Sequence, residues 1–186
     1  MNVLLIGPPG SGKGTQGERL AERLKLDHIA VGDLLRAEVA AKSPIGEQVS
    51  GIMQRGELVP DDIILDLLRP RLEAAAQTNG FLLDGFPRTL DQAHEAKRLA
   101  EEGGFLADVA VYLDAPRGEL VKRILLRAQV EGRADDTPDV IESRLKVFDE
   151  ATAPLVEHYR ERGLLRVVDA NRNPDEVTDE ILQVLP

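Results

Sequence analysis

The sequence has 186 residues, a formal net charge of −10, an ordinary 42% of hydrophobic residues, and no Cys. This length allows one α/β domain with a small insertion, and the absence of Cys excludes disulfides, thiolate zinc sites and a Cys nucleophile. The acidic balance, the lack of an apolar run near the ~18–20 residues of a membrane span, and the lack of a signal-peptide pattern predict a cytoplasmic protein with no nucleic-acid or membrane partner.

Short apolar runs alternate with amphipathic helical patterns along the chain. The runs predict five buried strands: Val3–Ile6, His28–Val31, Phe81–Asp84, Val109–Leu113 and Leu165–Val168. Three helices are expected to start where a capping side chain precedes Pro, at Ser43-Pro44, Thr137-Pro138 and Asn173-Pro174. Strands that alternate with helices and lack hairpin signals predict a doubly wound parallel sheet with helices on both faces.

The segment Gly7–Thr15 carries the strongest chemical signal, because it contains G-x-x-x-x-G-K between a predicted strand and a predicted helix. Glycines let backbone N–H groups approach phosphate oxygens closely, and the start of the helix favours negative charge. Lys13 adds a positive charge for the β- and γ-phosphates. The alternative is a glycine turn that only joins a strand to a helix. The segment therefore predicts an ATP-phosphate site that includes Gly10, Ser11, Gly12, Lys13, Gly14 and Thr15.

Two segments depart from the alternation of strands and helices. The first suggests two short helices, around residues 33–42 and 44–55, with no strand between them. The second is a short, polar, glycine-containing stretch from Gln129 to Asp136, which reads as a loop between two long helices. We therefore expect core segments 1–29, 60–128 and 137–186, a helical insertion at 30–59, and a loop at 129–136.

The segment Gly-Pro-Pro-Gly-Ser-Gly-Lys-Gly-Thr-Gln at residues 7–16 resembles the adenylate kinases. Further matching features follow in order: Gly32–Arg36, Gly56–Pro60, Asp84–Thr89 with Gln92, and the arginine spacing Arg123, Arg127, Arg133 and Arg144. The resemblance runs from residue 3 to about residue 177. It implies a P-loop, three-layer, five-stranded core with an insertion that binds the nucleoside monophosphate and a lid at residues 129–136. The lid is of the short type, since the chain has neither an inserted zinc-ribbon-sized domain nor Cys.

The resemblance implies a monomeric enzyme that transfers a phosphoryl group from ATP to AMP with Mg²⁺ and so maintains adenine nucleotide levels. Such transfer depends on alignment and charge neutralisation, and Arg binds phosphate bidentately and stays charged. By resemblance, Arg36 and Arg88 bind the AMP phosphate. Arg123 and Arg127 lie on the ATP side, and two more arginines, Arg133 and Arg144, reach across from the lid and the long helix. The alternative for each arginine is a solvated helix face.

Asp84 ends the apolar run Phe81–Asp84, at the carboxyl edge where such sheets bind ligands. We expect it to hold Mg²⁺ through water, because Mg²⁺ keeps much of its hydration shell. The alternative is an Asp that starts a turn before Gly85.

The resemblance assigns further residues to AMP: Val31, Glu57, Leu58, Val59, Gly85, Phe86, Pro87 and Gln92, together with Arg133 and Arg144. In the family, the residue at Gln92 reads the adenine edge. Thr89-x-x-Gln92 is also a capping box, however, so both a structural and a base-reading role stay open. Arg172 lies where the family contacts the adenine of ATP through main-chain atoms, and an ordinary loop is the alternative.

Two other functions are compatible with parts of this sequence. A pyrimidine (UMP/CMP) monophosphate kinase shares the fold and chemistry. Gln92 favours adenine, whereas Val31 departs from the Thr usual in adenylate kinases. The second is a P-loop regulatory NTPase or binding module. The sequence lacks the Asn/Thr-Lys-x-Asp segment of guanine-specific switches, and a pure binding module has no need of an arginine cluster.

Overall fold

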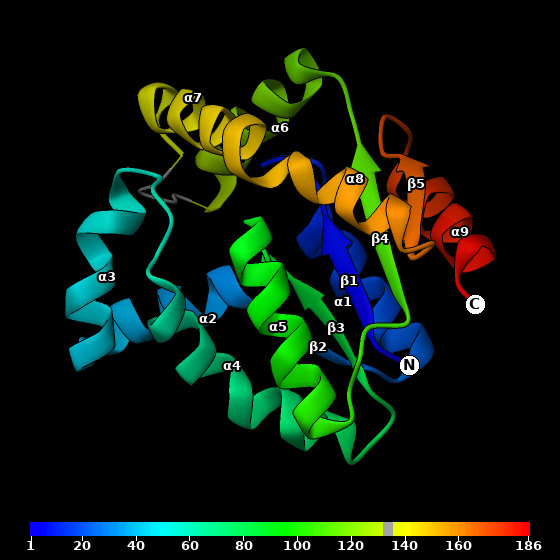
Figure 1. Ribbon diagram of the computed structural model, residues 1–186. Helices are drawn as coiled ribbons and strands as arrows, with labels where there is room; N and C mark the ends of the chain where they lie inside the picture. Colours follow the sequence, from blue (N-terminus) through cyan, green and yellow to red (C-terminus); the bar gives the residue numbers. More distant parts are fainter. Residues whose placement is uncertain (132–135) are drawn as a thin grey trace.

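A computed structural model describes residues 1–131 and 136–186 of the chain, whose central feature is a five-stranded parallel sheet (Figure 1). The strands run in the order β2-β3-β1-β4-β5. Their bounds are β1 Val3–Ile6, β2 Asp27–Ala30, β3 Phe81–Asp84, β4 Val109–Asp114 and β5 Leu165–Asp169. The parallel pairing of every neighbouring pair confirms the predicted doubly wound α/β class.

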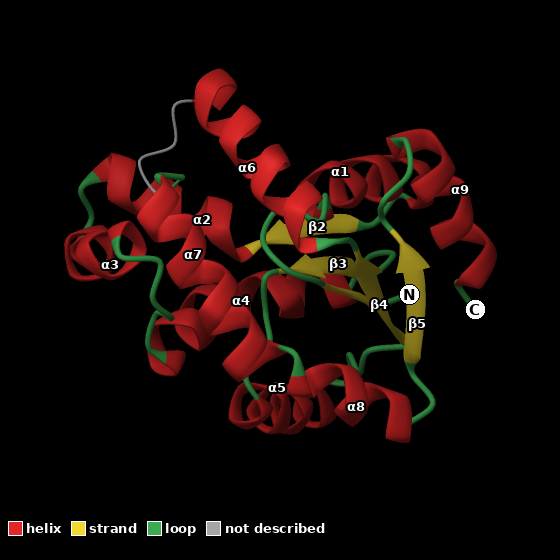
Figure 2. Ribbon diagram, turned by 90° about the horizontal axis from the view of Figure 1, so that it is seen from above, coloured by secondary structure: helices red, strands yellow, loops and turns green. Residues whose placement is uncertain are grey.

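Helices cover both faces of the sheet, which gives three layers (Figure 2). The helices are α1 Lys13–Leu24, α2 Val31–Ala41, α3 Pro44–Gln54, α4 Asp61–Ala76, α5 Leu90–Gly103, α6 Arg117–Glu131, α7 Pro138–Val147, the π-helical turn η1 Phe148–Thr152, α8 Pro154–Glu161 and α9 Pro174–Val184. Helices α1 and α9 lie on one face, and α4, α5 and α8 lie on the other. No helix in the described ranges is long and apolar enough to cross a membrane.

Strand β1 shows why both faces need a cover. Val3 and Leu5 belong to the cluster beneath α1 and α9, whereas Leu4 and Ile6 belong to the cluster on the opposite face. All four side chains are buried. Because successive side chains of a strand point to opposite faces, a run of apolar residues with no polar alternation requires helices on both sides.

The predicted strand His28–Val31 is wrong at its end. Strand β2 stops at Ala30, and Val31 is the first residue of α2. The chain turns from strand to helix without a loop, because Ala30 keeps extended dihedral angles and itself serves as the N-cap residue. Val31 remains buried at 3% exposure, so its apolar character fits the start of this helix as well as it fits a strand.

Two of the three predicted helix caps are confirmed. Ser43 Oγ accepts a bond of 3.0 Å from Gly46 N, and Asn173 Oδ1 accepts one of 3.0 Å from Glu176 N. Thr137 occupies the N-cap position of α7, but within the described structure its side chain makes no capping hydrogen bond. The spacing before Pro138 therefore predicts where this helix starts but not how its first N–H groups are satisfied.

The segment between β2 and α4 contains the two predicted short helices, α2 and α3, which pack against each other. The division into a core, an insertion and a lid stays a prediction. At the other irregular segment, helix α6 continues to Glu131. The first three residues of the expected loop at 129–136 are therefore helical.

Candidate active site

A cavity of about 630 Å³ opens at the carboxyl ends of β1, β2 and β3, and a smaller pocket of about 210 Å³ adjoins it. Every predicted site residue in the described part of the chain lines one of the two. The predicted residues that line the large cavity are Gly10, Gly12, Lys13, Gly14, Thr15, Val31, Arg36, Glu57, Leu58, Val59, Asp84, Gly85, Phe86, Pro87, Arg88, Gln92, Arg123, Arg127 and Arg144. Ser11 and Arg172 line the smaller pocket, and Gly12, Thr15 and Arg123 line both the smaller pocket and the large cavity. Arg133 lies outside the described residues.

The loop between β1 and α1 is shaped to hold phosphate. Gly10 has φ +83°, and a Cβ there would lie 2.7 Å from the carbonyl oxygen of Leu120. Gly12, the N-cap of α1, has φ +94° and borders open space. Ser11 Oγ is buried and has no hydrogen-bond partner among the described residues. Positive-φ glycines at a helix start and an unsatisfied hydroxyl form a cradle that suits phosphate oxygens.

Lys13 lies folded against this loop. Its Nζ donates to the carbonyl oxygens of Gly7 at 2.7 Å and Pro8 at 3.0 Å. Burial lowers the pKa of Lys13 to about 8; Asp84 opposes the shift, and Arg88 adds to it. A polyanion at the loop would therefore stabilise the ammonium form.

Two predicted arginines meet at one buried carboxylate. Arg127, on α6, donates to both oxygens of Asp136 at 2.8 and 2.7 Å. Arg144, on α7, donates to Asp136 Oδ1 at 2.8 Å. The Asp136 side chain is 0% exposed. Charge-assisted bonds of this length fix the guanidiniums relative to each other and hold both beside the cavity.

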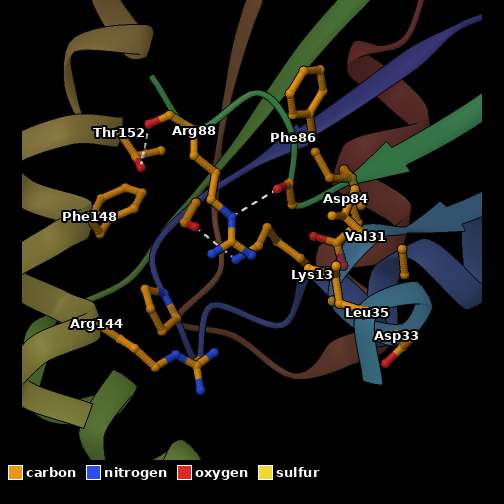
Figure 3. A pocket seen from close by; sticks show the side chains of 18 of the residues that line it. Lys13, Val31, Asp33, Leu35, Asp84, Phe86, Arg88, Arg144, Phe148 and Thr152 are labelled. Carbon is orange, nitrogen blue, oxygen red and sulfur yellow. Dashed lines mark hydrogen bonds between the residues drawn. The ribbon is translucent and has the colours of Figure 1, made fainter. Parts of the chain in front are cut away.

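The two arginines predicted for AMP come from different elements. Arg36 lies on α2 and pairs with Asp33 one turn earlier. Arg88 lies in the loop after β3, and its Nε donates to the carbonyl oxygen of Gly85 at 2.8 Å. Figure 3 shows Arg88 reaching into the cavity between Lys13 on one side and Arg144 on the other.

Arg123 lies between the two pockets. Its Nε donates to Glu119 Oε1 at 2.9 Å, and its Nη1 donates to the carbonyl oxygen of Ala170 at 2.9 Å. Arg172 instead pairs with Asp169 and Glu180, each at 3.2 Å. The Arg172 side chain is thus paired with two carboxylates at the rim of the smaller pocket, and a contact of its main chain with the adenine of ATP stays a prediction.

The capping question at α5 is answered for Thr89, whose Oγ1 accepts a bond of 3.1 Å from Gln92 N. The reciprocal half of a capping box does not form. Gln92 Oε1 accepts from Arg88 N at 2.7 Å instead, and Gln92 Nε2 donates to Asp61 Oδ1 at 2.6 Å. The amide keeps a second N–H and a second lone pair, so these bonds leave base reading chemically possible.

The remaining residues predicted for AMP form the wall of the cavity on the side of α2 and α3. Val31, Val59 and Phe86 are buried and apolar. Glu57 is exposed, and its carboxylate pairs with Arg55 through two bonds of 2.8 Å. Its side chain is therefore directed to a neighbour, and any contact with a base falls to the main chain and to Leu58 and Val59.

Asp84 ends β3 and lines the large cavity near Lys13 (Figure 3). Among the described residues, no group of three or more His, Cys, Asp or Glu side chains could hold a metal ion. A divalent cation at this place would therefore have to take most of its ligands from water and from substrate oxygens. That is the preference of Mg²⁺, which fits one carboxylate beside a phosphate cradle.

The comparison with known proteins agrees with this geometry. The family model described as adenylate kinase matches residues 5–164. The chain belongs to the adenylate kinase family. The adenylate kinase of Xanthomonas campestris pv. campestris (strain 8004) is 47% identical over 185 residues, which cover 100% of this chain and 99% of the relative. The adenylate kinase of Xylella fastidiosa (strain M23) is 45% identical over the same shares. The family resemblance indicated by the motifs is thus confirmed, and the chain is a phosphotransferase.

Asp136 and Thr152 are polar residues of this adenylate kinase family site that the sequence does not assign to it. Asp136 is expected only as the end of a loop, and Thr152 is not predicted as a site residue. A signal existed for each of them. Asp136 is an acidic residue between two helices that carry predicted phosphate-binding arginines, and Thr152 lies two residues before Pro154 within a long helical pattern.

Proposed function

We propose that ATP binds with its phosphates on the loop Gly7–Thr15, that AMP binds against α2, α3 and the loop after β3, and that the phosphoryl group passes between them beside Lys13. The reaction is ATP + AMP = 2 ADP. One observation carries the assignment of the two sites. Basic side chains from separate elements converge on a single cavity next to the phosphate cradle: Lys13, Arg36, Arg88, Arg123, Arg127 and Arg144.

The arrangement suits phosphoryl transfer because two polyanions must be brought into contact. The positive charges offset the repulsion between the nucleotides, and fixed guanidiniums align the attacking and leaving oxygens. Lys13 stays in contact with the transferred phosphoryl group as that group leaves the loop Gly7–Thr15, while Arg88 and Arg36 hold the acceptor phosphate. Arg123, Arg127 and Arg144 neutralise charge on the donor and on the group in transit, and we assign Arg133 to the same task.

Asp84 is the residue that we propose to hold Mg²⁺ through water. The ion, when bound with ATP, neutralises charge on the phosphate oxygens. We propose that the enzyme is a monomer, as the family resemblance of the sequence implies. We also propose that the enzyme works in the cytoplasm, where adenine nucleotides are used.

Adenine is the base that the acceptor pocket favours. Gln92 lines the cavity, and its amide retains an N–H and a lone pair, the pair of groups that the adenine edge complements. Val31 adds an apolar wall and no hydroxyl. A pyrimidine monophosphate kinase, the alternative from the sequence, is not favoured, because the similar proteins reported above are adenylate kinases.

Titration calorimetry with each nucleotide alone tests the assignment of the two sites. Arg88→Lys should weaken AMP binding about tenfold and leave ATP binding unchanged, because Lys cannot replace a bidentate phosphate contact. Arg123→Lys should show the opposite pattern. Arg98→Lys is the matched control, since Arg98 pairs with Glu95 and Glu102 on the exposed side of α5. If Arg88→Lys weakened ATP binding as much as AMP binding, the two sites would be wrongly assigned.

A further inference from the structure

A wide helical turn interrupts the long helix that crosses the cavity. Between α7 and α8, the turn η1 closes with a bond of 2.9 Å from Ala153 N to the carbonyl oxygen of Phe148, five residues back. The cause is Pro154, which has no N–H to donate and whose ring would clash with the carbonyl oxygen four residues earlier in a regular α-helix. A π-turn relieves both problems by taking up one extra residue.

Within this turn lies Thr152. A Thr hydroxyl inside a helix commonly bonds back to the carbonyl four residues earlier, but that of Thr152 bonds to another segment of the chain. Thr152 is buried at 6% exposure, and its Oγ1 donates to the carbonyl oxygen of Arg88 at 2.8 Å. Figure 3 shows Thr152, Phe148 and Arg144 projecting from one side of this helix towards Arg88 and the cavity.

The main chain of Arg88 is held at both of its polar groups. Its N–H donates to Gln92 Oε1 at 2.7 Å, and its carbonyl accepts from Thr152. Its side chain is tied as well, by the bond from Nε to the carbonyl of Gly85. Because loop residues are otherwise the most mobile part of a fold, these three bonds contribute to holding the guanidinium at one place in the cavity.

We propose that Thr152 is a positioning residue that holds Arg88 for the acceptor phosphate. It also links the place of Arg88 to that of Arg144, eight residues earlier on the same helical segment. The inference rests on the proposed function, because it assumes that Arg88 binds AMP. In this proposal Thr152, although it lines the cavity, acts through the Arg88 backbone rather than by binding the phosphate itself.

The test compares Thr152→Val, which keeps the shape and loses the hydroxyl, with Thr152→Ser, which keeps the hydroxyl. Steady-state kinetics with ATP and AMP should show that Thr152→Val lowers kcat/KM for AMP about tenfold, as expected when a half-buried carbonyl loses its partner. In Thr152→Val the KM for ATP should stay within about twofold of the wild-type value. In Thr152→Ser the kcat/KM for AMP should also lie within about twofold of the wild-type value. Thr78→Val is the control, because Thr78 Oγ1 also donates to a backbone carbonyl, that of Ala75 at 2.9 Å, but outside the site.

Thr152→Ala removes the same hydroxyl without placing a methyl group against the carbonyl, and it takes the place of the valine variant if that variant does not fold. A second readout is a double-mutant cycle with Arg88→Lys. If Thr152 acts through Arg88, the effects of the two changes on kcat/KM for AMP are non-additive. In the Arg88→Lys background, Thr152→Val should then lower kcat/KM for AMP only slightly. Equal losses for AMP and ATP, additive losses, or a failure of Ser to rescue would overturn the positioning role. Absence of AMP phosphorylation by the wild-type protein would instead refute the proposed function.

Discussion

Replacing Asp136 by Asn tests the carboxylate that joins Arg127 to Arg144. The side chain of Asp136 is 0% exposed, while those of Arg127 and Arg144 are 24% and 18% exposed. Asn keeps the shape but removes the charge and turns one acceptor oxygen into a donor that faces a guanidinium. Breaking a buried ion pair costs about 3–5 kcal/mol. Since both arginines keep some contact with water, we expect a loss of about 2 kcal/mol in the free energy of unfolding.

Urea unfolding and steady-state kinetics of Asp136→Asn give the two readouts. With an m-value of about 2 kcal/mol/M, the urea midpoint should fall by about 1 M. The kcat should fall about 100-fold, because displacing a positioned charge by about 1 Å has that effect. Glu102→Gln is the matched control. It breaks an exposed pair with Arg98 and should cost under ~1 kcal/mol with normal kcat. A midpoint and a kcat both close to wild type would show that Asp136 does not organise the two arginines.

Four further predictions concern three residues that line the cavity. Lys13→Met should lower kcat by orders of magnitude with the fold retained, and its circular dichroism should match wild type; a variant that keeps most of its kcat refutes the role. The pKa of Lys13 is about 8 before ligand binds, and bound phosphates should raise this pKa, so the wild type should take up protons when ATP binds between about pH 8 and 9. Calorimetry in buffers of different ionisation enthalpy should detect this uptake in the wild type and none in Lys13→Met. Val31→Thr should lower the KM for AMP by at most about tenfold, the value of one neutral hydrogen bond, and leave the KM for ATP unchanged; a change in ATP affinity would place Val31 outside the AMP site. Gly56→Ala should raise the KM for AMP more than that for ATP, because Gly56 has φ +71° and a Cβ there would lie 2.7 Å from Arg144 Cγ. Unaltered kinetics would show that the close contact between Gly56 and Arg144 on α7 does not matter for AMP binding.

The sequence was enough to predict the sheet and the phosphate loop, because both are encoded locally. A run such as Val3–Ile6 has no polar alternation, and the glycine and lysine spacing of Gly7–Thr15 is specific for phosphate binding when it lies between a strand and a helix. Errors arose at the boundaries. Strand β2 passes directly into α2 at Val31, and a β-branched residue is compatible with either state.

The polar contacts of the site could not be predicted from the sequence, because they join distant segments. Asp136 meets Arg127 and Arg144 only when two helices are packed side by side. Thr152 meets the Arg88 carbonyl across 64 residues of sequence, through a π-turn whose one local sign is Pro154. Composition and periodicity indicate which side chains are apolar or charged, but not which acceptor each donor finds.

Phosphoryl transfer from ATP to AMP, UMP, CMP and GMP, measured in parallel with Mg²⁺ present, tests the central claim most directly. The proposed function predicts that AMP is the fastest acceptor and that ADP is formed from both substrates in equal amounts. It also predicts that removing Mg²⁺ with a chelator abolishes turnover, because the negative charge on the transferred phosphoryl group is then no longer neutralised by the divalent ion. No transfer to any monophosphate, or transfer to UMP or CMP faster than to AMP, would contradict it.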